Sequence, residues 1–445
     1  MQAVYYPPLF LYILIVTGIP LAVLKPFGAF ILTAFLLSSA DSCAFTLTRT
    51  SFFGPYFNVN DACLLIGMVA AVSYLISKRE KMPFPKIILF MLIALLISFA
   101  QTWYVLKEIS YDLLRSLRWA LALPLNFLIA YVILDRKEKI KYFILALFIG
   151  AVVSAIQHFV FVSSYFPFFQ AKSFNIEHIR TIAFRSPGIW FLLAAGAYSF
   201  KLKWLNWKII FVSSILFLAS VLLNQTRSIW ISAIVSLPIL ILIFNRREAR
   251  RRFMIVLLLI LLLLTVIYFL MAWLMPTIDI FTLIRQRVES LANSQIRYET
   301  TTTRQAGFVN EMDAWSKGTL IFGRGLAYFM PIYYSGVKGV DFIGWGHLGH
   351  VTTLAQLGLF GLFIYSFYFP WIIIKASLFL WKDYSQDIKF LGLLTAACMI
   401  SSWVLFIMSD CFLAQHAVEG LIFGGAWGIA RYAHRGTHEK RYFYD

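Results

Sequence analysis

Long apolar segments recur along most of the chain and are separated by short polar ones. Most of them approach the roughly 20 residues that an α-helix needs to cross a bilayer. The pattern therefore predicts membrane-spanning helices over residues 9–40, 60–77, 87–106, 112–134, 142–163, 184–200, 209–224, 228–244, 253–275, 351–374, 388–409 and 417–431.

The first apolar segment is too long for one straight helix. Residues that bend or interrupt helices fall near its middle, at Gly18, Pro20, Pro26 and Gly28, with the charged Lys25 among them. We expect either one kinked crossing or two short ones. One crossing gives about twelve transmembrane helices with both chain ends in the cytoplasm, whereas two place the N-terminus outside.

Basic residues are concentrated in every second loop between the predicted helices. This alternation is typical of cytoplasmic loops in membrane proteins. It assigns 23 of the 39 basic residues to the cytoplasmic side and 15 to the outer side, with Lys25 left over. The loops predicted to be cytoplasmic are 78–86, 135–141, 201–208, 245–252, 375–389 and the tail from Arg431.

The two predicted sides also differ in their basic residues. The cytoplasmic side carries 10 Arg and 13 Lys, whereas the outer side carries 11 Arg and 4 Lys. Lysine is sufficient for lipid headgroups, while the planar arginine fork grips phosphate or carboxylate with two parallel hydrogen bonds. The outer side is therefore predicted to bind anions. Arg115 and Arg118, at the outer start of helix 112–134, are expected to face protein or headgroups.

The longest polar segment is the predicted outer loop over residues 276–350. Within it, apolar and basic residues recur every three to four positions over 283–317, which predicts helical structure. A second outer loop covers 164–183. We expect an all-α polytopic membrane protein that forms one integral membrane domain over 1–445, with a large, partly helical outer loop.

Composition excludes a soluble protein of ordinary kind. Only 13% of the 445 residues are charged and 60% are hydrophobic, against roughly 25% charged residues in average soluble proteins. The net charge of +18 is explained by the basic loops, so we expect no nucleic-acid partner. The four cysteines are scattered without a CxxC pair and are expected to be apolar fillers: Cys43, Cys63, Cys398 and Cys411.

Three polar clusters stand at predicted outer ends of helices. The first is the run 224–228, Asn-Gln-Thr-Arg-Ser, whose Arg227 either extends to headgroup phosphates or grips an anionic substrate group. The second contains the four threonines 300–303 and Arg304, where a helix N-terminus beside an arginine either is simply capped or binds an anion. It continues to Gly323-Arg324-Gly325, where Arg324 is either a solvated turn residue or part of that anion site.

The third cluster is the run 344–350, Gly-Trp-Gly-His-Leu-Gly-His, just before the helix 351–374. His347 and His350 lack nearby carboxylates or cysteines at ligand spacing, so zinc is disfavoured. The remaining interpretations are plain interfacial histidines, or a base that hydrogen-bonds a substrate at the membrane surface.

The order of these clusters resembles the O-antigen ligase and polysaccharide polymerase superfamily, most clearly over roughly residues 220–375. The run 226–228 matches the family's Thr/Ser-Arg-Ser motif. His347, eleven residues before Gly358, matches its motif histidine. The asparagine that usually follows is Leu348 here, which leaves open whether His350 shares the role.

The resemblance implies a GT-C-like fold and glycosyl transfer on the periplasmic face of a bacterial inner membrane. The donor would be a glycan on undecaprenyl diphosphate. The acceptor would be a sugar hydroxyl, on lipid A–core for a ligase, which we expect first, or on another lipid-linked glycan for a polymerase. The family is described as metal-independent, so no metal or other cofactor is expected. Membrane lipids are the remaining partners.

The resemblance also implies roles for particular residues. His347 would act on the acceptor hydroxyl as the catalytic residue, while Arg227 and Arg304 would bind the diphosphate. The segment from Arg180 to Gly188 resembles the family's arginine-containing entry to a middle span, although Gly188 stands where asparagine is usual. The second-rank candidates are Arg324, Arg180, Arg185 and His350.

Two other classes of function stay open from the sequence. A transporter or flippase for a lipid-linked anion would also use interior arginines, but it predicts charges within spans and paired half-repeats, and neither is prominent here. A non-catalytic scaffold is the third possibility.

Overall fold

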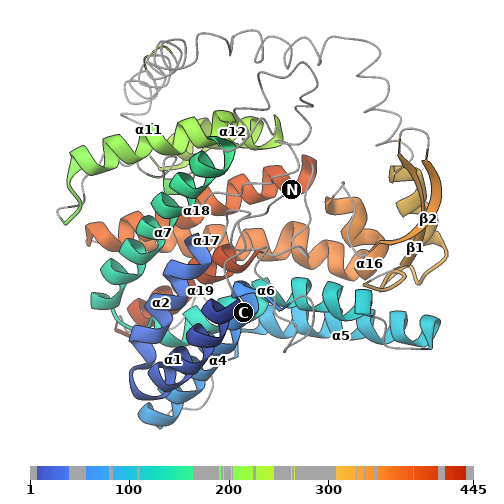
Figure 1. The fold of residues 1–445 in the computed structure, drawn as a ribbon, viewed down its shortest axis with the longest axis horizontal. Helices are drawn as coiled ribbons and strands as arrows, with labels where there is room; N and C mark the ends of the chain where they lie inside the picture. Colours follow the sequence, from blue (N-terminus) through green and yellow to red (C-terminus); the bar gives the residue numbers. More distant parts are fainter. Residues whose placement is uncertain are drawn as a thin grey trace.

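The computed structural model describes residues 8–39, 57–79, 84–107, 111–163, 190–191, 194, 202, 204–223, 227–244, 262, 265, 307–326, 328–334, 337–343, 349–383, 385–408 and 416–436. Long helices dominate this part of the chain (Figure 1). Their bounds are α1 Pro8–Leu24, α2 Pro26–Ser39, α4 Val59–Lys78, α5 Lys86–Leu106, α6 Tyr111–Ile133, α7 Glu138–Ser163, α11 Trp207–Leu223, α12 Arg227–Phe244, α16 Gly349–Phe363, the π-helical turn η1 Ile364–Tyr368, α17 Phe369–Trp381, α18 Gln386–Met408 and α19 Ala417–Gly436.

The prediction of a helical membrane protein is confirmed. Within the described residues, six helical stretches are long and apolar enough to cross a bilayer: Val59–Lys78, Lys86–Val105, Ser116–Ile133, Glu138–Gln157, Gly349–Trp381 and Gln386–Ile407. The predicted spans 184–200 and 253–275 lie almost wholly outside the described residues, and the total of about twelve crossings stays a prediction.

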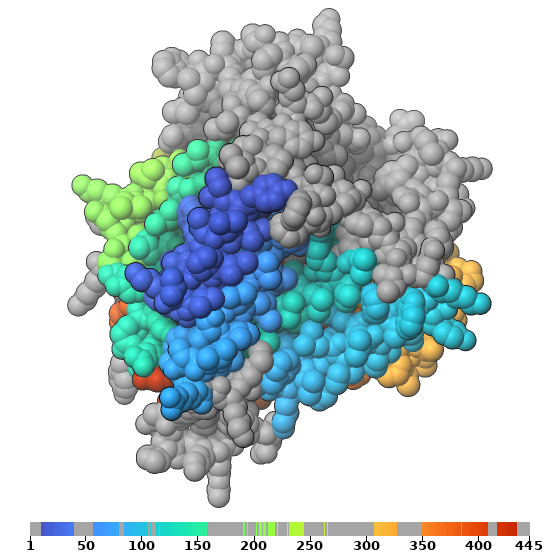
Figure 2. Space-filling model, turned by 60° about the horizontal axis from the view of Figure 1, so that its bottom comes forward, coloured from blue at the N-terminus to red at the C-terminus, as the bar shows by residue number. Residues whose placement is uncertain are grey.

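The first apolar segment forms two helices, α1 and α2, that meet at Lys25. The Lys25 N–H donates to the Leu21 carbonyl at 2.8 Å, and the Ala29 N–H donates to the Lys25 carbonyl at 3.1 Å. These two hydrogen bonds have the four-residue spacing of an α-helix and extend across the junction. Pro26 has no N–H, so one helical hydrogen bond is missing there. The segment is therefore interrupted at Lys25 and Pro26, and the choice between one kinked crossing and two short ones stays a prediction. Figure 2 shows α1 and α2, in dark blue, beside α4.

The last helix, α19, packs against α6 through a row of glycines. A Cβ atom on Gly420 would lie 2.5 Å from the Leu123 carbonyl oxygen, and one on Gly424 would overlap the Phe127 carbonyl. Gly428, another four residues on, faces the end of α6 in the same way. Small residues at four-residue spacing allow two helix backbones to approach this closely.

Four of the six loops predicted to be cytoplasmic are joined by polar contacts. Asp135 accepts hydrogen bonds from Lys78 and from Lys139, which ties loop 135–141 to the end of α4. Lys137 Nζ lies 3.4 Å from Asp383 Oδ2, and Trp204 Nε1 donates to Asp387 at 2.7 Å. These contacts connect loops 78–86, 135–141, 201–208 and 375–389, as expected of loops on one side of a membrane.

One element was not predicted from the sequence. Strands β1 Tyr328–Tyr334 and β2 Val337–Ile343 form an antiparallel hairpin in which Tyr328 pairs with Ile343 and Tyr334 with Val337. The hairpin is at the right of Figure 1. The predicted outer loop is therefore not purely helical: of its helical prediction over 283–317, the described residues 307–316 are helical, and we call them the loop helix.

Candidate functional site

The site begins at a break within α16. Gly358 adopts φ 66° and ψ −163°, a conformation that essentially only glycine tolerates, and it interrupts the helix between Leu357 and Leu359. An interrupted helix leaves N–H and C=O groups without helical partners, and such groups need other partners in an apolar environment. The break therefore requires a second segment to bond with it.

That second segment is residues 319–326, which we call the GRG turn because it contains Gly323-Arg324-Gly325. The Arg324 N–H donates to the Ala355 carbonyl at 2.8 Å, and the Gly325 N–H donates to the Gln356 carbonyl at 3.2 Å. In the opposite direction, the N–H groups of residues 359 and 360 donate to the carbonyls of residues 320 and 321 at 3.1 and 3.0 Å. The turn thus supplies hydrogen-bond partners to backbone groups on both sides of the break.

Glycines make this close contact possible. The positive-φ glycines of the described residues are Gly323, Gly325 and Gly358, and all three lie at this junction. A Cβ on Gly323 would lie 2.7 Å from the Ala355 carbonyl oxygen, and one on Gly358 would overlap the backbone of Ile321. The backbones touch directly, so the junction fixes the position of the turn relative to the helix.

Helix α5 supports the junction from another side. Ser98 Oγ donates to the Gln356 carbonyl at 2.8 Å, and Gln101 Nε2 donates to Thr319 Oγ1 at 3.2 Å. Gln356 Nε2 in turn donates to the Leu326 carbonyl at 2.8 Å. Three segments that are far apart in sequence therefore share one hydrogen-bonded network.

A buried carboxyl group lies at the neighbouring contact between the loop helix and α16. Thr352 Oγ1 donates a 2.9 Å hydrogen bond to Glu311 Oε1, and both residues are buried. The second oxygen, Glu311 Oε2, is buried and has no hydrogen-bond partner. Burial raises the pKa of Glu311 to about 7, although the hydrogen bond from Thr352 opposes the shift.

His350 lies on a different face of α16 from the GRG turn. It is separated from Ala355 by five residues, which corresponds to about 140° around an α-helix. Its ring packs edge-on against Phe406 of α18, with ring centroids 6.5 Å apart. The structure thus separates two second-rank candidates, because Arg324 belongs to the GRG turn and His350 faces α18.

The other predicted site residues are described partly or not at all. Arg227 is the first residue of α12, and its side chain lies outside the described residues. Arg324 is half-buried. Arg304, His347, Arg180 and Arg185 lie wholly outside the described residues, so their predicted roles stay predictions.

One predicted outer arginine has a clear partner. Arg118 Nη1 lies 3.2 Å from Asp61 Oδ2, so Arg118 faces protein, one of the two alternatives expected for it. Asp61 also accepts a hydrogen bond from the Asn58 N–H at 2.9 Å, and Asn58 caps α4. This pair joins the N-terminal parts of α4 and α6, which are predicted to lie on the outer side.

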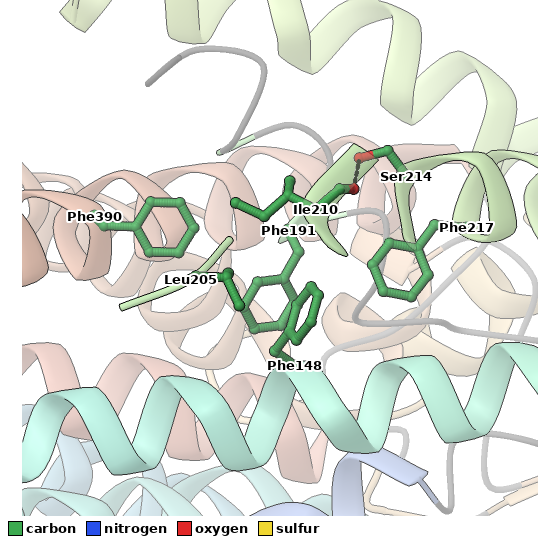
Figure 3. A pocket seen from close by; sticks show the side chains of 7 residues that line it. All are labelled: Phe148, Phe191, Leu205, Ile210, Ser214, Phe217 and Phe390. Carbon is green, nitrogen blue, oxygen red and sulfur yellow. Dashed lines mark hydrogen bonds between the residues drawn. The ribbon is translucent and has the colours of Figure 1, made fainter. Parts of the chain in front are cut away.

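The apolar pocket in Figure 3 lies apart from this junction, between α7, α11 and α18. Its one hydroxyl among the described lining residues, on Ser214, donates to the Ile210 carbonyl at 2.8 Å, so none of these residues offers a free polar group to a substrate. We interpret the pocket as a packing gap. It is lined by Phe148, Phe191, Leu205, Ile210, Ser214, Phe217 and Phe390.

Comparison with known proteins supplies no assignment. No protein-family model matches the chain. No curated protein matches it significantly. Among the described residues, no three histidine, cysteine, aspartate or glutamate side chains come together in a group that could hold a metal ion.

Proposed function

We propose that this protein is a membrane glycosyltransferase of the O-antigen ligase type. It transfers a glycan from undecaprenyl diphosphate to a sugar hydroxyl of lipid A–core, at the periplasmic face of a bacterial inner membrane. The observation that carries the proposal is the GRG turn bonded into the break at Gly358. Both are parts of the sequence motifs on which the family resemblance rests.

The reaction makes two chemical demands. The bond from the sugar to the diphosphate breaks, so the charge that develops on the leaving phosphate must be stabilised. The acceptor hydroxyl must be oriented and must lose its proton. We assign Arg227 and Arg304 to the diphosphate and His347 to the hydroxyl. Arg324, held at the junction through its backbone, is the foremost secondary candidate.

The same chemistry would serve a polysaccharide polymerase, whose acceptor is another lipid-linked glycan. The two functions differ only in the acceptor. Purified protein offered both acceptors with the same donor distinguishes them, since a ligase extends only lipid A–core.

A transporter or flippase of a lipid-linked anion is the alternative of another class. Transporters use the free ends of broken helices to bind ions or substrates. At Gly358, however, the N–H and C=O groups beside the break are bonded to residues 320–325. This arrangement favours a fixed structural junction over a helix end open to a transported ion.

The test uses Arg227, where charge and shape can be separated. Arg227→Lys keeps the charge but replaces the two-pronged guanidinium with a compact ammonium. Loss of such a donor set costs on the order of 3 kcal/mol in the transition state, or about a hundredfold in turnover. We expect both Arg227→Lys and Arg227→Ala to transfer glycan at least about a hundredfold more slowly than the wild type.

The matched control is Arg136→Ala, which changes an exposed arginine in a loop predicted to be cytoplasmic. It should transfer glycan at the wild-type rate when the purified proteins are compared at equal abundance. Near-normal turnover of Arg227→Ala would assign this residue to headgroup contact and contradict its proposed role.

A further inference from the structure

Glu311 occupies an unusual position for a charged residue. The loop helix places it on the same face as Ala314 and Trp315, and Ala314 packs on Ala355 of α16. Its exposed fraction is 2%. Asp313, two residues along, has a side chain that is 52% exposed and pairs with Lys317. One helix therefore carries one buried and one solvated carboxyl group.

The hydrogen bonding of Glu311 is incomplete. Oε1 accepts from Thr352 at 2.9 Å, whereas the buried Oε2 has no partner. An ionised carboxylate with an unpartnered buried oxygen is costly, because it has lost its water without gaining a donor. Protonation removes the charge and leaves the hydrogen bond to Thr352 in place.

Among the residues that the structure describes, the charged and titratable groups near Glu311 do not neutralise it. On the loop helix, Asp313 and Lys317 pair with each other at the exposed surface. On α16, His350 faces Phe406 instead. Arg324 belongs to the adjacent turn, and among the described residues no cation forms an ion pair with Glu311.

We propose that Glu311 is a positioning residue that, in its protonated form, holds the loop helix against α16. The loop helix ends at Ser316, and only Lys317 and Gly318 separate it from the GRG turn. Displacement of the helix would therefore pull on the turn at the break in α16. The role in transfer rests on the proposed function, but the docking of the helix does not.

The direction of the pH effect follows from the raised pKa. The docked state binds the proton more tightly than the released state, so docking is strongest below pH 4.5 and weakens as pH rises toward 7. Because the pKa moves from 4.5 to about 7, the docking equilibrium changes by at most about 300-fold over this range.

The experiment measures docking directly in the full-length protein in detergent. Spin labels replace Val309 on the loop helix and Tyr104 on α5, both of which are well exposed. The distance distribution between them is recorded from pH 4.5 to 8. In the wild-type background we expect one narrow distribution at low pH and a second, broader population that grows toward pH 8.

Three variants isolate the cause. Glu311→Gln is neutral at every pH and still accepts from Thr352, so its distribution should stay narrow throughout. Asp313→Asn, the matched control, should respond like the wild type. Thr352→Val removes the hydrogen bond that holds the pKa down, so its response should move to higher pH.

The outcomes separate this inference from the proposed function. A pH-independent distance in the wild-type background, or a wild-type response in Glu311→Gln, would overturn the role of Glu311. Transfer assays add a second readout: wild-type turnover should fall above pH 7 relative to Glu311→Gln. If no variant transfers glycan, the proposed function fails, while the distance measurement still decides whether protonated Glu311 docks the helix.

Discussion

Replacing Gly358 with alanine tests the junction at its narrowest point. The backbone there has φ 66° and ψ −163°, and a Cβ would overlap the backbone of Ile321. A non-glycine residue in this region costs about 2 kcal/mol in strain. The overlap also pushes the GRG turn away from α16.

The loss of hydrogen bonds adds to the strain. Four backbone hydrogen bonds of 2.8 to 3.2 Å join the turn to α16. Breaking two of them costs about 2 kcal/mol at a net 1 kcal/mol each. The total of about 4 kcal/mol corresponds to roughly a thousandfold shift toward the open junction.

Hydrogen exchange of the amides of residues 323–325 and 359–360 reports this opening directly. We expect Gly358→Ala to accelerate their exchange by about three orders of magnitude, with slower glycan transfer. The control is Gly307→Ala in the loop helix, where an added Cβ meets nothing within 4 Å and alanine favours the helix. Wild-type protection in Gly358→Ala would refute this account of the junction.

Two further predictions concern the helix bundle. Gly424→Ala places a Cβ against the Phe127 carbonyl and should lower the free energy of unfolding by about 2 kcal/mol, measured by thermal unfolding. The control is Gly307→Ala, and equal melting temperatures of the two variants would contradict the close contact of α6 and α19. Burial raises the pKa of Asp135, but hydrogen bonds from Lys139, Lys78 and Tyr74 outweigh it and lower the pKa below its usual 3.8. Asp135→Asn loses these charged hydrogen bonds and should therefore lower the free energy of unfolding by about 2 kcal/mol at pH 7. This stabilisation is present above pH 3.8 and is lost as pH falls further, so the melting temperatures of variant and wild type should converge in acid.

The sequence was informative about the helices because hydrophobicity and length largely determine a membrane span. The predicted segments 60–77, 87–106 and 388–409 agree with α4, α5 and α18 to within two residues at either end. The contacts among the basic loops agree with the predicted alternation. Glycine and proline also indicated correctly that the helix of the first segment is interrupted, which happens at Lys25 and Pro26.

The candidate site was less predictable because it depends on contacts across long sequence separations. The break at Gly358 lies within a continuous apolar run, so hydropathy predicted an ordinary helix there. Glu311 was one of several scattered acidic residues. Its spacing of three and four residues from Ala314 and Trp315 was the available signal that it lies on an apolar face.

The β-hairpin had a local signal. Two runs rich in aromatic and β-branched residues flank the dipeptide Ser335-Gly336, a spacing typical of tight hairpins. The three-to-four-residue periodicity predicted a helix only over 283–317, and no strand was predicted for the rest of the loop.

The pairing of α6 with α19 has a consequence for biosynthesis. About 280 residues separate the end of α6 from the start of α19, and α19 makes the most extensive helix contact that α6 has in the described structure. At ribosomal rates of 5–20 residues per second, α6 waits roughly 15 to 60 s in the membrane before its partner is made. During this interval the surface of α6 that later contacts the glycines of α19 faces lipid, the insertion machinery or a temporary helix neighbour. A C-terminal truncation that removes α19 should therefore leave a chain whose early helices insert into the membrane but lack the α6–α19 contact. Such an incompletely packed chain should be degraded by membrane quality control.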